Sequence, residues 1–162
     1  MHTTLSAQTH QAVRAIAAEY DVTVFMVLHA AVASLLRTMS QSSDIVVGTP
    51  VSGRGDADVD GLVGMFVNTL ALRTAVDKDA GFTELLKQVR DTDLGAFEHA
   101  DVPFDRIVER LNPERSATLH PFFQVSVALE DNSAIELDFA GLTATAARID
   151  TGPVSYTHLR AP

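Results

Sequence analysis

The chain has 162 residues, 46% of them apolar and 20% charged, so it is long enough for one globular domain or one lobe of a larger domain. A formal net charge of −9 without a basic cluster argues against nucleic acid and anionic membrane surfaces as partners. The absence of Cys excludes disulfides, thiolate metal sites and a Cys nucleophile, and with no secretion signal at the N-terminus we expect a cytoplasmic protein.

Apolar residues at helical spacing predict two helices near the start of the chain. The first follows a capping residue at Ser6 and the second a capping residue at Thr23. The stretch 22–36 is apolar almost all round, yet it is too short to span a bilayer, so we expect a buried core helix. His29 in this helix is interpreted as a satisfied core residue rather than a catalytic base.

Two predicted strands enclose an acidic loop. Residues 45–49 are short and β-branched, which predicts a buried strand stopped by Pro50. Residues 52–61 are rich in Gly and Asp and predict a loop. Strand character returns over 65–72, where side chains at even and odd positions would lie on opposite faces.

The acidic loop contains two short patterns that point to other functions. Residues 56–61 match the front of a calcium-binding loop, but the position that needs a bidentate carboxylate is Val67, which has no side-chain oxygen. We therefore expect no metal site. The Arg-Gly-Asp tripeptide at 54–56 is interpreted as a chance combination of common loop residues.

The second half of the chain predicts two helices followed by antiparallel strands. A helix begins after Gly81, is broken at 101–103, and is followed by a short helix over 104–111. Period-2 alternation predicts strands at 123–129 and 135–139, joined by a turn at 131–133, and a further strand is expected over 142–149. The mixture predicts an α/β sandwich with a mixed sheet.

No catalytic set is evident in the chain. Sandwich-type acyltransferases need a His base with an Asp four residues later, and none of the six His has one. His99 lies near Asp101 and Asp105 beside a Pro turn and is interpreted as a capping residue. No Gly-rich loop with a Lys supports nucleotide binding. We therefore expect no catalytic residue in this chain.

Four segments in order carry a family resemblance. Residues 48–54 read GTPVSGR, and residues 63–70 read VGMFVNTL, closed by Arg73. Residues 99–105 read HADVPFD, and residues 115–122 read RSATLHPF. Together they resemble the G-T-P-x-x-G-R, G-x-F-V-N-T, H-x-D-x-P-F-E and R-D-x-S-R-N-P-L motifs of nonribosomal peptide synthetase condensation domains, the third with Asp for Glu and the fourth more loosely.

The resemblance implies a fold, a reaction and partners. Condensation domains have two lobes, each like chloramphenicol acetyltransferase, and join two aminoacyl or peptidyl thioesters into an amide. Both substrates arrive on phosphopantetheine arms of carrier proteins, through a tunnel between the lobes, in synthetases that also carry adenylation domains. The residues implied to be structural members of the family motifs are Arg54, Gly64, Val67, Arg73, His99, Asp101, Pro103, Phe104, Arg115 and Pro121.

The family's catalytic H-H-x-x-x-D-G motif does not occur in these residues, and in the family it lies in the N-terminal lobe. The resemblance therefore implies that residues 4–153 are an incomplete C-terminal lobe, inactive alone, with a two-layer α/β sandwich fold. Residues 154–162 do not resemble the family and are expected to be a foreign or disordered tail. The alternatives are an epimerisation domain, a coenzyme A-dependent acyltransferase of the same superfamily, or a non-catalytic carrier-protein docking module.

Asn68 is the polar residue in an otherwise apolar motif. A buried unsatisfied amide costs about 1–3 kcal/mol, so Asn68 must be hydrogen-bonded. It either ties down neighbouring backbone or faces the tunnel between lobes and orients the acceptor arm. The resemblance makes Asn68, Phe66 and Thr69 the tunnel candidates. An exposed lobe interface would also make the isolated chain poorly soluble.

Overall fold

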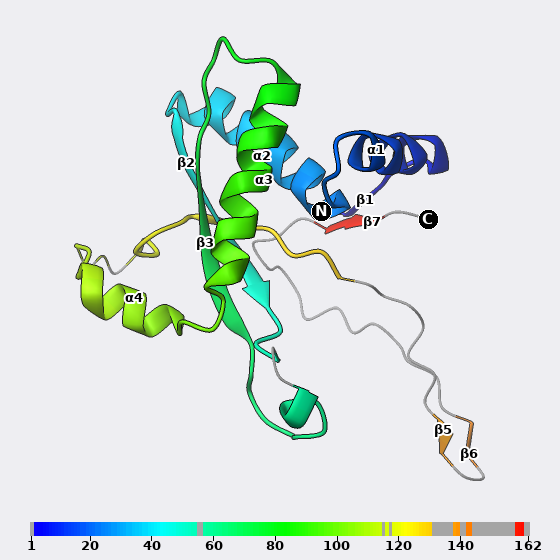
Figure 1. The fold of residues 1–162 in the computed structure, drawn as a ribbon, viewed down its shortest axis with the longest axis vertical. Coiled ribbons are helices and arrows are strands. Elements are labelled where there is room, and N and C mark those ends of the chain that lie inside the picture. Colours follow the sequence, from blue (N-terminus) through cyan, green and yellow to red (C-terminus); the bar gives the residue numbers. More distant parts are fainter. Residues whose placement is uncertain are drawn as a thin grey trace. The chain divides into compact units, whose positions relative to one another are not determined.

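Figure 1 shows the computed structural model of the chain, which describes residues 2–54, 57–114, 116, 118–130, 138–139, 142–143 and 158–160. The chain divides into two compact units. One comprises Val13–Ala128 and is called the central unit below. The other combines Met1–Ala12 with Leu129–Pro162 and is called the terminal unit. The four motif segments fall in the central unit.

The terminal unit contains two small strand pairs. β1 (His2–Thr4) pairs in parallel with β7 (His158–Arg160), and β5 (Asp138–Phe139) pairs antiparallel with β6 (Leu142–Thr143). β7 thus falls in the segment predicted to be a tail, and that assignment stays a prediction. The predicted turn at 131–133 and most of the strand predicted at 142–149 lie outside the described residues.

Helix α1 (Ala7–Glu19) begins in the terminal unit and ends in the central unit. As predicted, Ser6 caps it, since the Ser6 hydroxyl accepts a hydrogen bond from the Thr9 N–H at 3.0 Å. Among the described residues, no single helix is long and apolar enough to cross a membrane, although the bent pair of α1 and α2 would meet the length and composition requirement together.

The central unit is built on a mixed three-stranded sheet in the order β3-β2-β4. β2 (Asp44–Val51) runs antiparallel to β3 (Asn68–Ala75) along its whole length. β4 (Val125–Ser126) pairs with β2 in parallel, at Val47 and Gly48. The predicted mixed sheet is confirmed. The strand predicted over 123–129 is wrong in extent, because only two of its residues join the ladder.

Two predicted strand boundaries are wrong. β2 does not stop before Pro50 but continues to Val51. Beyond Gly48 the β4 side of β2 has no ladder partner among the described residues, so a proline nitrogen facing that side gives up no ladder bond. β3 begins at Asn68 instead of residue 65, because residues 65–67 belong to the loop and expose Met65 and Val67 to solvent.

The helices of the central unit follow the predicted boundaries. α2 (Val24–Ser40) starts after Thr23, whose hydroxyl accepts from the Met26 N–H at 3.2 Å. α3 (Phe82–Glu98) follows Gly81, and α4 (Phe104–Leu111) follows the break at 101–103. α2 packs on β2, α3 packs on β3, and the two helices contact each other, so both cover the same face of the sheet (Figure 1).

The core lies between that face and the two helices. Residues of β2 and β3 at alternate positions point into it, with Val47 directly opposite Leu72 and both fully buried. The core cluster that contains Val47 takes its other buried residues mainly from the helices, and these are Ala17, Met26, Val27, Ala30, Ala33, Ile45, Val76, Leu85, Leu86 and Val89. Asn68, at the start of β3, has the same strand parity as Leu70 and Leu72, as predicted.

Candidate functional site

The side-chain amide of Asn68 joins the start of β3 to the connection between α3 and α4. Its Nδ2 donates to the carbonyl oxygens of Ala100 at 2.9 Å and Val102 at 2.8 Å. Its Oδ1 accepts from the Phe104 N–H at 3.0 Å. Both amide hydrogens and one carbonyl lone pair are therefore used on backbone that lies more than thirty residues further along the chain.

Asn68 also completes the N-terminus of α4. The first N–H groups of a helix have no partner within the helix, and a side-chain oxygen usually accepts from one of them. Pro103 stands at the N-cap of α4 and provides no side-chain hydrogen bond. The Asn68 Oδ1 supplies the missing acceptor for the Phe104 N–H. Asn68 therefore caps α4, although it lies on β3 and is distant from α4 in the sequence.

The α3–α4 turn, which Asn68 anchors, exposes its polar side chains to solvent. His99 is the C-cap residue of α3, and its carbonyl accepts from the Val102 N–H at 3.2 Å. The side chains of His99 and Asp101 are both exposed. Pro103 has a φ of −60°, the value its ring imposes, and α4 begins at the next residue. The predicted role of this segment, ending one helix and starting the next, is confirmed.

Arg54 organises the loop between β2 and β3. Its guanidinium donates to three backbone carbonyls of that loop, at Val59, at Asp60 (3.3 Å) and at Leu62 (2.9 Å). The same group lies 4.2 Å from the centre of the Phe66 ring, within range of a cation–π contact. Because these contacts occupy the guanidinium, Arg54 acts on its own loop, which disfavours the Arg-Gly-Asp adhesion reading further.

Gly53 allows the loop to close on itself. Its φ is +62°, in the left-handed region that side chains other than Gly rarely adopt. A Cβ at this position would lie 1.7 Å from the carbonyl oxygen of Phe66. The Gly-Arg pair of the first motif and the Phe of the second therefore meet, although the loop separates them in sequence. Gly64 also lies near Phe66, since a Cβ there would approach its ring to 3.1 Å.

An aromatic cluster links the third and fourth motifs. The ring of Phe104 lies 5.4 Å from that of His120, 5.6 Å from Phe122 and 6.1 Å from Phe123. The His120 and Phe123 rings are 3.9 Å apart. Pro121, between them in sequence, is exposed. Arg115, the first residue of the fourth motif, lies outside the described residues.

Phe123 connects the aromatic cluster to the sheet. Its ring covers Gly48 so closely that a Cβ on Gly48 would lie 2.3 Å from the ring. Two residues further on the chain forms β4, and the Val127 N–H donates to the Gly48 carbonyl at 2.8 Å. The four motifs thus form one connected set of contacts in the central unit.

The three tunnel candidates do not point to one place. Asn68 uses its amide on the α3–α4 connection, Phe66 lies half-buried against the Arg54 guanidinium, and Thr69 has the opposite strand parity to Asn68 on β3. Val67 is 52% exposed. Structural anchoring is therefore observed for Asn68, while contact of these three residues with a substrate stays a prediction.

Arg73, which closes the second motif, pairs with Asp44 across the sheet. Its Nε and Nη2 donate to the two carboxylate oxygens of Asp44, each at 2.9 Å. The hydrogen bond from Arg73 holds the pKa of Asp44 below its ordinary value, and the same hydrogen bond from Asp44 raises the pKa of Arg73. Both side chains are largely exposed, so the pair ties the strands together only weakly.

A buried His–Asp pair escaped the sequence reasoning. The Nδ1 of His29 on α2 lies 2.9 Å from Oδ1 of Asp93 on α3, and both side chains are fully buried. The local spacing of an Asp four residues after a His does not include this pair, because the two residues are 64 positions apart. A detectable signal was Asp93 itself, which continues the buried stripe of Leu86 and Val89 on α3.

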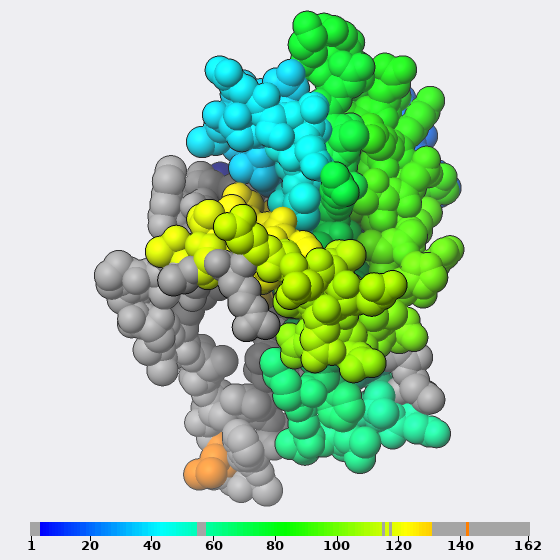
Figure 2. Space-filling model, turned by 90° about the vertical axis from the view of Figure 1, so that its left-hand side faces the viewer, coloured from blue at the N-terminus to red at the C-terminus, as the bar shows by residue number. Residues whose placement is uncertain are grey.

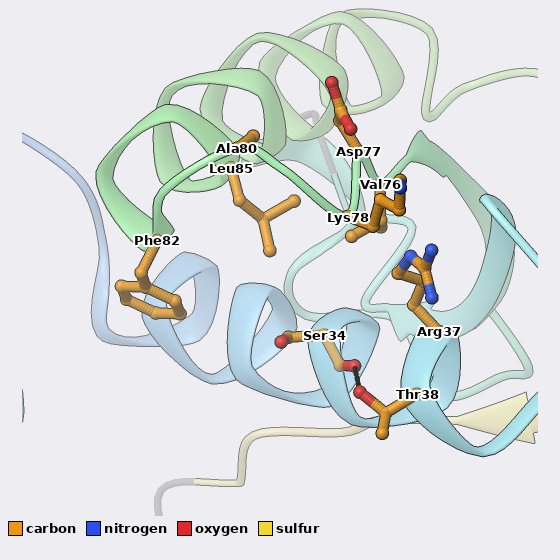
Figure 3. Close-up of a pocket in the computed structure, with 9 residues that line it drawn as sticks. All are labelled: Ser34, Arg37, Thr38, Val76, Asp77, Lys78, Ala80, Phe82 and Leu85. Carbon is orange, nitrogen blue, oxygen red and sulfur yellow. Dashed lines mark hydrogen bonds between the residues drawn. The ribbon is translucent and has the colours of Figure 1, made fainter. Parts of the chain in front are cut away.

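A small pocket of about 190 Å³ lies between α2 and the segment that follows β3 (Figure 3). Asn68 is at the other end of that strand. Its volume is below the range of about 300–1,000 Å³ that is usual for small-molecule sites. No motif residue lines it. The lining comes from α2, the connection after β3 and the start of α3, and consists of Ser34, Arg37, Thr38, Val76, Asp77, Lys78, Ala80, Phe82 and Leu85.

The loop before β3 presents apolar side chains to solvent. Val63 is 105% exposed and Met65 is 86% exposed, and Leu62 and Val67 are more than half exposed. In Figure 2 this turquoise loop forms the surface below α4. We call these four residues the apolar ridge. An apolar ridge on a loop that Arg54 holds in place is a candidate contact surface for another part of a larger protein.

Comparison with known proteins gives consistent matches. The Condensation domain family model matches residues 1–156. An isonitrile lipopeptide synthase of Mycobacterium tuberculosis is 48% identical over 145 residues, which are 90% of this chain and 6% of that protein.

Two solved structures share the fold. A four-domain nonribosomal peptide synthetase, holo-AB3403 bound to AMP and glycine, superposes with a TM-score of 0.76 at 27% identity, over 78% of this chain and 10% of that one. The first condensation domain of the calcium-dependent antibiotic synthetase, in complex with a substrate analogue, superposes with a TM-score of 0.64 at 26% identity, over 69% of this chain and 26% of that one. The chain therefore spans only a small part of each protein that it matches.

Proposed function

We propose that this chain, which belongs to the condensation domain family, supplies the C-terminal lobe of a domain that forms amide bonds in a nonribosomal peptide synthetase. The family membership and the chloramphenicol acetyltransferase-like α/β fold predicted from the motifs are confirmed. The substrates in this proposal are aminoacyl or peptidyl thioesters on the phosphopantetheine arms of carrier proteins, in a cytoplasmic enzyme that also has adenylation domains. Residues 4–153 would form the lobe.

The connected motif contacts carry the proposal. The segments that identify the family converge on Asn68, Arg54 and Phe104 rather than being scattered through the core. Such a set of contacts fixes the relative positions of the β2–β3 loop and the α3–α4 turn, which are two surface segments. Binding and catalytic surfaces are commonly built from loops that a rigid scaffold holds in place.

The apolar ridge supports a role beside another protein surface. Val63 and Met65 are almost wholly exposed, and leaving such side chains in water sacrifices about 1.5–3 kcal/mol each relative to burial. Since the chain spans 26% of a solved condensation domain, the proposed occupant is the remaining lobe of the same domain. The ridge and its loop would then lie at the substrate tunnel between the lobes.

The proposal is tested by replacing Asn68 with Ala in a synthetase module that contains this chain together with its catalytic lobe. We expect at least a tenfold loss of amide product from two loaded carrier proteins, because the α3–α4 turn would lose its anchor. Gln88→Ala is the matched control, since Gln88 is an exposed amide on α3. Wild-type product formation by Asn68→Ala, with only the melting temperature lowered, would show that Asn68 matters for stability alone.

A further inference from the structure

His29 and Asp93 form a polar contact inside an otherwise apolar layer. The Nδ1 of His29 lies 2.9 Å from Oδ1 and 3.2 Å from Oδ2 of Asp93, and neither side chain has measurable exposure. The second ring nitrogen, Nε2, is also buried and has no hydrogen-bond partner in the described part of the chain. Among the described residues, the hydrogen bonds of these two side chains are therefore the ones that they make with each other.

Burying such a polar pair in a core is energetically unfavourable compared with burying apolar side chains. Removing an imidazole and a carboxylate from water costs free energy that one hydrogen bond only partly returns, and the orphan Nε2 adds to that cost. Buried polar pairs of this kind are often replaced by apolar residues without loss of stability. The pair therefore calls for an explanation other than stability.

Apolar contacts also join α2 to α3, among them an edge-to-face contact between the rings of Phe25 and Phe97, whose centroids lie 6.3 Å apart. The other buried residues of α2 are Met26, Val27, Ala30 and Ala33, of which Ala30 and Ala33 are small. Apolar contacts are non-directional, so they favour close packing of the two helices more than one exact position of α3 along α2. A hydrogen bond, in contrast, weakens steeply when its geometry is displaced. His29 and Asp93 hence fix one relative position of the two helices.

That position matters at the end of α3. Asp93 lies five residues, or about 7.5 Å along the helix axis, before Glu98 at the end of α3, and Ala100 follows two residues later. Ala100 is the first of the backbone groups that Asn68 holds, at 2.9 Å. A slip of α3 along α2 would move the Ala100 and Val102 carbonyls out of reach of the Asn68 amide.

We propose that His29 and Asp93 are positioning residues, which set the register of α3 on α2 so that the α3–α4 turn meets Asn68. The inference goes beyond the proposed function and does not depend on it, because the predicted consequence is a property of the turn itself. According to this inference, a buried pair that lies outside the four motifs affects the structure of the motif segment 99–105.

Hydrogen exchange of the Phe104 N–H, which is bonded to the Asn68 Oδ1, tests the proposal in the full chain. The variant His29→Leu/Asp93→Ala replaces the pair with apolar side chains of similar total volume. We expect its melting temperature to stay near that of the wild type while the Phe104 N–H exchanges at least tenfold faster. Asp93→Asn keeps an acceptor for the His29 Nδ1–H, so it should retain wild-type exchange at Phe104.

Val89→Ala is the control for general loss of stability, because Val89 is buried on the same helix and makes no polar side-chain contact. Its Phe104 exchange should rise only as far as global unfolding requires. Wild-type exchange at Phe104 in a stably folded double variant would overturn the proposal. If the double variant does not fold, Asp93→Asn is compared with Asp93→Ala at temperatures of equal global stability, and equal Phe104 exchange overturns it as well.

Discussion

At the scale of single residues, Asn68 shows why a polar side chain occurs in the most apolar of the four motifs. It satisfies two carbonyls of the connection between α3 and α4 and the first N–H of α4, at a turn where Pro103 offers no cap of its own. Neither Gln nor Asp reproduces this combination, because Gln is one methylene longer and Asp has no N–H donors. The identity of the residue thus follows from its hydrogen bonds.

Replacing Asn68 with Ala should lower the free energy of unfolding of the chain by about 2–3 kcal/mol, since three hydrogen bonds are lost and the first N–H of α4 loses its acceptor. Asn68→Asp should be at least as damaging near neutral pH, because a carboxylate would face two carbonyl oxygens. Urea unfolding followed by circular dichroism measures both changes. A loss below about 0.5 kcal/mol in Asn68→Ala would contradict the anchoring role.

The Asp44–Arg73 pair makes a prediction about pH. Its hydrogen bond depresses the pKa of Asp44 in the folded chain, so its contribution to stability is present above the unfolded-state pKa and is lost as pH falls through the folded-state pKa. In Arg73→Gln the pKa of Asp44 should return upward to its ordinary range, as carbon-detected NMR titration of the carboxyl would show. Arg106→Gln, which removes another exposed Arg from an ion pair, should leave Asp44 unchanged. An Asp44 pKa that stays low in Arg73→Gln would contradict this account.

At the scale of elements, the β2–β3 loop behaves as a structured connection. The loop is stabilised by its own contacts, which involve the backbone conformation of Gly53, the guanidinium of Arg54 and the ring of Phe66. The loop therefore does not need the apolar ridge for its own packing, and the ridge residues are free to face solvent. The packing of Phe123 on Gly48 similarly ties the segment after α4 to the outer side of β2.

Gly48→Ala should destabilise the chain by about 1–3 kcal/mol, because the new Cβ would lie 2.3 Å from the Phe123 ring, which Phe104 and His120 hold in place. Gly95→Ala is the matched control, since Gly95 lies within α3 with nothing near a new Cβ. It should stabilise the chain by about 0.5–1 kcal/mol. Chemical denaturation measures both. Equal effects of the two substitutions would show that Phe123 does not pack on Gly48 as described.

At the scale of the whole molecule, the exposed apolar residues of the β2–β3 loop are consistent with the proposed place of this chain beside a second lobe. The apolar ridge places Val63 and Met65 in solvent, and exposed apolar residues close together in a loop are candidates for a contact with another surface. The lobe arrangement of the proposed function supplies such a surface. Without it, the ridge should promote association between copies of the chain.

Val63→Ser/Met65→Ser should reduce self-association of the isolated chain, as measured by sedimentation velocity, with little change in melting temperature because both side chains are exposed. Met39→Ser is the control, as Met39 is 73% exposed but lies on α2. It should leave association largely as it is. If the double substitution in the ridge had no more effect than Met39→Ser, the ridge would not be the associating surface.

Local chemistry explains which predictions succeeded. The caps at Ser6 and Thr23, the start of α3 after Gly81 and the break before α4 depend on residues within about four positions of one another, so they can be read along the chain. The start of β3 was placed three residues too early, because the apolar residues at 65–67 have strand character but lie in the loop that Arg54 holds. An apolar pattern alone does not distinguish a strand from an exposed ridge.

By itself, the sequence determined the family, the α/β class, the helices and the segments that matter. Only the tertiary structure decided what those segments do to one another. Asn68 reaches partners 32 to 36 residues away, and His29 meets Asp93 at a separation of 64 residues. Propensities and caps act between near neighbours and leave a trace in local sequence. A hydrogen bond between distant segments depends on how whole helices pack on a sheet, and that packing fixed the direction of the Asn68 amide.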